Sequence, residues 1–206
     1  MRIAIVLYQG FDELDAIAPF EVFRHASRHG ADIDVKLVTL DGAEEVTASG
    51  GLRIHPDGLL SGRPDLVLVP GGRWGDRSAP GARAEVMRGD LPQRLRELKA
   101  DGAIMATVCT GAMLAAAAGL TAGRPATTHH SALDDLRASG ARVIDARVVD
   151  DGDLITAGGI TSGLDLALWI VEREFGSKLA NEVAETMEYR RTGDVWNADP
   201  EARRPA

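Results

Sequence analysis

The stretch from Ala103 to Gly119 constrains the fold of this chain more than any other. Residues 103–108 are apolar and partly β-branched, which is typical of a strand that is covered on both faces. An alanine-rich segment follows from Ala112, and Gly119 stands where a helix C-cap is wanted. The stretch therefore predicts a buried strand, a sharp turn at Cys109 and a helix.

Cys109 is the only cysteine of the 206 residues, and the pattern places it at a strand end and at a helix N-terminus. Backbone N–H groups and the helix dipole stabilise a thiolate there, so we expect a thiol pKa below its ordinary value of ~8.5. This is the geometry of a nucleophile elbow, although the Gly-x-Ser-x-Gly pattern is absent. The alternative is a buried cysteine that packs as a small hydrophobic residue.

Apolar runs that predict strands alternate with segments whose apolar positions recur at helical spacing. The predicted strands cover residues 3–8, 33–40, 65–70, 103–108 and 126–128, a pair within 142–155 and a small hairpin within 46–54. Besides the helix after Cys109, the predicted helices cover 14–27, 91–99, 132–139 with Ser131 as N-cap, 162–175 and 179–189.

Because most of these strands are apolar throughout, the alternation predicts an α/β fold with a parallel sheet sandwiched by helices. A chain of this length is large enough to bury a good core as one unit. We expect a single domain over residues 1–190, followed by a polar C-terminal tail over residues 191–206 with little periodicity.

Composition excludes several classes of protein. The net charge of −8 argues against a nucleic-acid surface, since phosphate binding depends on clustered Lys and Arg. No run approaches the ~20 apolar residues of a membrane helix, and the N-terminal apolar run is too short for a signal sequence. A single cysteine cannot form an internal disulfide, which fits a reducing compartment. We therefore expect a soluble, cytoplasmic protein that binds neither nucleic acid nor membranes.

In a fold of this kind the site lies outside the carboxyl ends of the strands. Glycine and threonine residues stand at two of the predicted turns there, namely Gly71-Gly72 and Cys109-Thr110. A thiolate that attacks a multiple bond needs backbone donors for the charge that develops. The N–H groups of Gly71, Gly72 and Thr110 are candidates for this oxyanion hole. A plain glycine loop at residues 71–72 is the alternative.

Asp15 is the candidate acid or base beside this thiol. Asp12 and Asp15 also stand at the spacing of a capping box at a helix start, so a helix cap is the competing interpretation. Pro19 lies within the same predicted helix, which we expect either to kink there or to begin nearer Ala18.

His129 and His130 are candidates for the border of the pocket, where one of them could pair with Cys109. Neighbouring residues point to different sides of a regular element, and no Cys or His cluster stands at the usual zinc spacing. We therefore expect no metal and no cofactor.

Five segments in this order resemble the ThiJ/PfpI family, which is class I glutamine amidotransferase-like. They are Leu14–Phe23, Val69–Gly72, Cys109–Ala112, Ala126–His129 and Thr156–Gly159. Within the family, the Cys-Thr-Gly elbow and the Leu-Asp-x-x-x-Pro segment are most similar to isonitrile hydratases, and also to the sensor half of AraC-type regulators. The resemblance implies a flavodoxin-like, doubly wound sheet and a homodimer, and it places Asp15 beside Cys109.

The same resemblance implies a lyase that hydrates an isonitrile to an N-substituted formamide. Cys109 would attack this small neutral electrophile and form a thioimidate, Asp15 would move the protons, and Thr110 would position water. Proteases and glyoxalases of the family tend to carry histidine directly after the cysteine or a Cys–His–acid triad, whereas Thr110 follows the cysteine here. A glyoxalase- or deglycase-like enzyme acting on α-oxoaldehydes, and a non-enzymatic ligand-binding or oxidative-stress sensor, are the alternatives.

Overall fold

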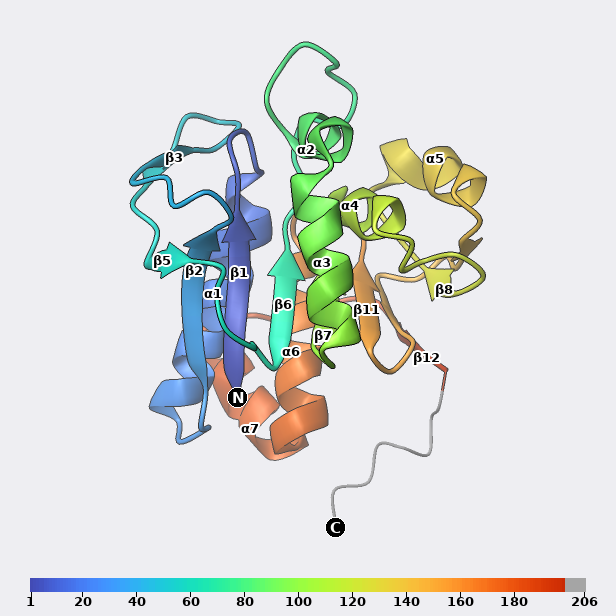
Figure 1. The fold of residues 1–206 in the computed structure, drawn as a ribbon. Helices are drawn as coiled ribbons and strands as arrows, with labels where there is room; N and C mark the ends of the chain where they lie inside the picture. The colour runs from blue at the N-terminus through green and yellow to red at the C-terminus, as the bar shows by residue number, and fades with distance from the viewer. Residues whose placement is uncertain (199–206) are drawn as a thin grey trace.

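The central sheet of the computed structural model, which describes residues 1–198, has eight strands in the order β12-β10-β11-β7-β6-β1-β2-β5 (Figure 1). Among the pairings described, β10 with β11 is antiparallel and the others in this sheet are parallel. The strands are β1 (Arg2–Leu7), β2 (Asp34–Thr39), β5 (Gly58–Leu59), β6 (Leu66–Val69), β7 (Ile104–Thr107), β10 (Val148–Asp150), β11 (Leu154–Ala157) and β12 (Val195–Asn197).

The inner strands are apolar because helices cover both of their faces. Every residue of β6 and β11 is buried, and only Arg2 of β1 is exposed. Full burial of a Val, Leu or Ile side chain contributes about 1.5–3 kcal/mol, so these strands form the centre of the core. The predicted doubly wound parallel sheet is confirmed.

Two groups of helices cover the sheet. Figure 1 shows α3 in front of it, whereas α1, α6 and α7 lie behind. The rear helices are α1 (Glu13–Arg28), α6 (Ser162–Phe175) and α7 (Ser177–Thr186). The others are α2 (Ala82–Arg88), α3 (Asp90–Ala100), α4 (Gly111–Ala117) and α5 (Leu133–Ala138), with the 3-10 helix η1 (His130–Ala132) before α5. Two small ribbons pair β3 (Val46–Thr47) with β4 (Arg53–Ile54) and β8 (Pro125–Ala126) with β9 (Arg142–Val143).

Pro19 lies inside α1, which begins at Glu13 rather than near Ala18. The proline ring packs against α6 at Gly163, where an added Cβ would lie 3.3 Å from Pro19 Cγ and Cδ. Since Gly163 has no side chain, the two helices approach closely at this point. The loss of one helical hydrogen bond at Pro19 is therefore offset by packing between α1 and α6.

Two local predictions differ from the structure. Ser131 does not cap α5, which begins at Leu133, because the Ser131 hydroxyl group bonds His129 Nδ1 at 2.8 Å. Within the predicted tail, β12 joins the edge of the sheet beside β10. Residues 199–206 of that tail lie outside the described residues. Within residues 1–198, no helix is long and apolar enough to cross a bilayer.

Candidate active site

Cys109 occupies a strained turn between β7 and α4. Its φ angle is 56°, in the left-handed region that residues other than glycine rarely adopt. The Cys109 N–H donates to the carbonyl group of Gly158, directly after β11, at 2.8 Å. The Thr128 hydroxyl group donates to the Cys109 carbonyl at 2.7 Å. These contacts hold the turn in place, and the predicted nucleophile elbow is confirmed.

Cys109 is largely buried, with 7% of the residue exposed, and two backbone N–H groups near its sulfur favour the thiolate and lower its pKa. One belongs to Thr110, at the start of α4, and the other to Ile160, in the loop after β11. Sequence reasoning missed Ile160. Ile160 has a φ of 40°, an unusual value for a β-branched residue, and nothing in its apolar side chain signals a role of its backbone.

Asp15 lies on the first turn of α1 and is fully buried. Its Oδ2 atom accepts a hydrogen bond from the Gly71 N–H at 2.9 Å, whereas its buried Oδ1 atom has no hydrogen-bond partner within residues 1–198. The Cys109 thiol lies close enough to influence the pKa of this carboxyl group. The helix cap is Asp12, whose side chain accepts from the Leu14 N–H at 3.2 Å. The capping interpretation therefore applies to Asp12, and the Asp15 side chain faces the thiol instead.

Burial favours the protonated form of the Asp15 carboxyl group. It raises the pKa of Asp15 from 3.8 to about 8, and the charge of Asp12 acts in the same direction. The Gly71 N–H and the Cys109 thiol favour the carboxylate, so they oppose this rise in the pKa of Asp15. Asp15 is therefore largely protonated at neutral pH, where it can donate a proton to a bound molecule.

The predicted lowering of the thiol pKa is wrong. Burial raises the pKa of Cys109 to about 12, and the Asp15 carboxylate adds to the rise. The N–H groups of Ile160 and Thr110 lower the pKa, but desolvation of the thiolate outweighs them. Below pH ~8 Asp15 is protonated and its charge no longer opposes the thiolate. The resting pair at neutral pH is a thiol beside a carboxylic acid.

Gly71 and Gly72 do not present the free oxyanion donors that the sequence predicted. The Gly71 N–H is engaged by Asp15, and the Gly72 N–H donates to Thr110 Oγ1 at 3.0 Å. An added Cβ at Gly71 would lie 2.5 Å from both the backbone nitrogen and Oγ1 of Thr110, so only glycine fits. The two glycines position Asp15 and Thr110. The donors nearest the sulfur are instead the N–H groups of Thr110 and Ile160.

Thr110 is buried directly after Cys109 in the chain. Because its hydroxyl oxygen accepts from the Gly72 N–H, that bond leaves the hydroxyl hydrogen available to a ligand. The cluster thus combines a thiol, a carboxylic acid, a hydroxyl group and N–H donors aimed at the sulfur. Such a cluster can add a nucleophile and a proton to an uncharged electrophile.

The two histidines lie at the edge of this cluster, with ring centroids 4.1 Å apart. His129 packs on Gly159, where an added Cβ would lie 2.4 Å from His129 Cδ2, next to Ile160. Burial and His130 lower the pKa of His129. His130 lines a pocket of about 460 Å³ that Thr128 and the loop 158–159 also border. A direct histidine–Cys109 contact is not among the hydrogen bonds found within residues 1–198.

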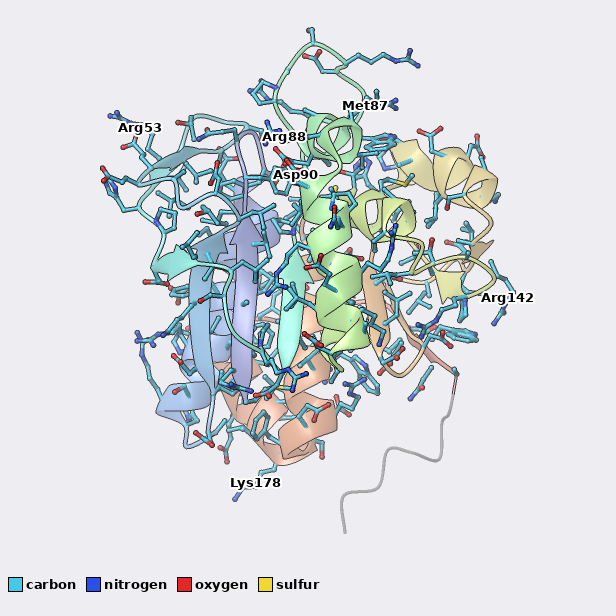
Figure 2. The ribbon with its side chains drawn as sticks, viewed as in Figure 1. Arg53, Met87, Arg88, Asp90, Arg142 and Lys178 are labelled. Atoms are coloured by element: carbon cyan, nitrogen blue, oxygen red, sulfur yellow. The ribbon has the colours of Figure 1, made fainter. Side chains whose placement is uncertain are left out.

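Charged side chains lie mostly outside this cluster. Figure 2 shows Arg53, Arg142 and Lys178 extending from the periphery of the molecule. In the part of the chain that the structure describes, no three His, Cys, Asp or Glu side chains converge as a metal site would require.

Comparison with known proteins places these features in context. A model described as the DJ-1/PfpI family matches residues 1–173. The chain is 33% identical over 191 residues to isonitrile hydratase of Pseudomonas putida, across 92% of this chain and 78% of that protein. It is 30% identical over 188 residues to the Parkinson disease protein 7 homolog of Danio rerio, across 88% of this chain and 94% of that protein.

A solved structure shows the same architecture. The crystal structure of a ThiJ/PfpI family protein from Pseudomonas syringae superposes with a TM-score of 0.82 at 27% identity. The superposition covers 93% of this chain and 76% of that one. The family resemblance and the flavodoxin-like fold predicted from the sequence are both confirmed.

Proposed function

This chain belongs to the DJ-1/PfpI family, and from that premise we propose that it hydrates an isonitrile to an N-substituted formamide. The observation that carries the proposal is the fully buried Asp15 carboxyl group beside the Cys109 thiol, where burial raises its pKa to about 8. An isonitrile carbon must gain both a nucleophile and a proton during hydration, and this pair supplies both. The similarity to isonitrile hydratase of Pseudomonas putida supports the same chemistry.

In the first step, the isonitrile carbon of R–N≡C gains a proton and a bond to sulfur. Asp15 donates its carboxyl proton to that carbon while Cys109 Sγ forms the C–S bond. The thiol proton passes to the Asp15 carboxylate, which is restored as the acid. The product is the thioimidate R–N=CH–S–Cys109. Because protons move in both directions, no net charge builds up in a buried site, where an uncompensated charge is costly.

In the second step, water adds to the C=N bond of the thioimidate. Asp15 donates its proton to the nitrogen and accepts a proton from the water, while oxygen bonds to carbon and gives R–NH–CH(OH)–S–Cys109. The C–S bond then breaks, and the hydroxyl proton returns through Asp15 to the sulfur. The formamide R–NH–CHO leaves and the thiol is regenerated. The Thr110 hydroxyl group holds the attacking water, and the N–H groups of Thr110 and Ile160 stabilise charge near the sulfur.

Incubation with cyclohexyl isonitrile and with p-nitrophenyl isonitrile tests the proposal. We expect the corresponding formamides by NMR, and none with Cys109→Ala. Met87→Ala is the matched control, because Met87 is 81% exposed and lies on α2. If no isonitrile is consumed but methylglyoxal is, the protein is a glyoxalase-like enzyme. If neither is consumed while Cys109 still oxidises, the sensor interpretation replaces catalysis.

For the same protein we propose a homodimer in the cytoplasm. The family membership supports the dimer, and the single cysteine fits a reducing compartment. Light scattering at micromolar concentration should give twice the 21.9 kDa mass of the chain. A mass equal to one chain would contradict the dimer.

A further inference from the structure

Tyr8 lies directly after β1 and is buried, with 6% of the residue exposed. Its hydroxyl group donates a hydrogen bond to the carbonyl oxygen of Pro70 at 2.7 Å. Pro70 follows β6, the neighbour of β1 in the sheet. The contact therefore joins the carboxyl ends of two adjacent central strands.

The Pro70 carbonyl and the Gly71 N–H belong to one peptide group. That N–H is the donor that holds Asp15 Oδ2 at 2.9 Å. A peptide group is a single delocalised unit, so a hydrogen bond accepted at its oxygen makes its N–H a stronger donor. A continuous path thus runs from the Tyr8 hydroxyl group through one amide to the carboxyl group of Asp15.

We propose that Tyr8 is a positioning residue for Asp15: its hydroxyl group polarises the Pro70–Gly71 peptide and thereby tightens the hydrogen bond by which Gly71 holds the carboxyl group. The proposal rests on the proton-carrying role of Asp15 in the proposed hydration. Tyr8 itself touches neither sulfur nor substrate in this scheme. It sets the strength of the contact that orients the proton donor.

The ionisable groups around this path leave Tyr8 a neutral donor. Burial raises the pKa of Tyr8 well above 10, and Asp15, Cys109, Glu85 and Asp12 add to the rise. Two groups influence the pKa of Asp15: Asp12, which is the N-cap of α1, and Cys109, which lies in the turn before α4. Tyr8 therefore keeps its proton throughout the pH range in which Asp15 titrates.

The first test is Tyr8→Phe, with titration of Asp15 followed by NMR of protein labelled with ¹³C at aspartate Cγ. The Asp15 signal is assigned by its loss in Asp15→Asn. Since the carboxylate loses part of its stabilising donor, we expect the pKa of Asp15 to rise by about 0.3–0.6. Turnover should show a lower kcat with little change in KM, because proton delivery is affected and substrate contacts are not.

Tyr189→Phe is the matched control. Like Tyr8, Tyr189 donates a hydrogen bond from its hydroxyl group, but its acceptor is the carboxylate oxygen Asp165 Oδ2, at 2.9 Å. That substitution removes the same atom without touching the Pro70–Gly71 peptide, so the Asp15 titration should stay as in the unsubstituted protein. If Tyr8→Phe and Tyr189→Phe leave the same Asp15 pKa, the proposal is overturned.

A second experiment remains possible even if the Tyr8→Phe variant does not fold. The chain holds two tyrosines, so 3-fluorotyrosine incorporated into Tyr189→Phe protein labels Tyr8 alone. The fluorinated phenol is a stronger donor, and the pKa of Asp15 should fall, opposite to the effect of Tyr8→Phe. An unchanged or raised value would contradict the polarised path.

These titrations need no substrate. The pKa of Asp15 should fall in order from phenylalanine through tyrosine to fluorotyrosine at position 8. If this order is found but no isonitrile is hydrated, the proposed reaction is wrong and the path from Tyr8 to Asp15 stands. If formamide is produced but the Asp15 pKa values show no such order, the reaction stands and the path from Tyr8 to Asp15 is wrong.

Discussion

Asp15 and Cys109 lie together in a buried site although they belong to segments that are distant in sequence, α1 and the turn into α4. Both side chains are buried, and burial raises the pKa of each. A neutral acid beside a neutral thiol is therefore the ground state at pH 7. Reaction from this state requires coupled proton transfer and attack, which suits an uncharged substrate.

Replacement of Cys109 should separate stability from activity. We expect both Cys109→Ala and Cys109→Gly to reduce formamide production by at least about a thousandfold, because each removes the nucleophile. Their free energies of unfolding should differ. Glycine adopts the φ of 56° without strain, so Cys109→Gly should be more stable than Cys109→Ala by about 1 kcal/mol. Urea denaturation measures the difference, and equal midpoints would mean that the turn relaxes in the alanine variant.

Asp15→Asn should lower turnover by about 10²–10⁴-fold, since it removes the proton carrier. The same substitution should speed alkylation of Cys109 by iodoacetamide at pH 9.5, where Asp15 is ionised and its charge raises the pKa of the thiol. At pH 6 Asp15 is protonated, and the two proteins should differ much less. Faster alkylation with undiminished turnover would show that Asp15 acts on the thiol without carrying protons.

The free energy of unfolding should fall as the pH rises from about 4 to about 8. Asp15 has a pKa of about 8 when folded, against 3.8 as its ordinary value, so the folded state binds the extra proton in this window. The slope from this one proton is about −1.4 kcal/mol per pH unit. Asp15→Asn removes that contribution, and the difference between the two urea-denaturation series isolates it. If the free energies of unfolding of the two proteins change in parallel with pH, Asp15 is ionised in the folded protein.

Gly71→Ala should be strongly destabilising. The new Cβ would lie 2.5 Å from the backbone nitrogen of Thr110, which cannot move without distorting the start of α4. We expect a loss of about 1–3 kcal/mol and a marked fall in turnover. Gly75→Ala is the control, because nothing lies within 4 Å of its added Cβ, and it should stay within about 0.5 kcal/mol of the unsubstituted protein. Equal effects of the two substitutions would contradict the close approach at Gly71.

The sequence by itself determined the inner strands of the sheet, the elbow and the family, whereas the edge strands β5 and β12 were not predicted. Apolar runs such as 65–70 predict buried strands because a parallel sheet covered on both faces excludes water from every residue. The turn at Cys109 is equally local, since the strand and the helix that flank it are adjacent in the chain. Asp15 was identified as well, but spacing alone left it between catalysis and a helix cap.

Only the tertiary structure decided what surrounds these residues. The thiol pKa rises mainly because packing removes Cys109 from water, and this desolvation depends on atoms that are distant in sequence. In addition, α1 brings Asp15 close to the thiol. The N–H groups of Gly71 and Gly72 are occupied by Asp15 and Thr110, which are also distant in sequence, and the Ile160 N–H lowers the pKa of the thiol from a loop about 50 residues away. The local sequence pattern thus identifies the reactive groups. Their protonation states depend on burial and on hydrogen-bond partners, and both of these are set by packing between segments that are distant in sequence.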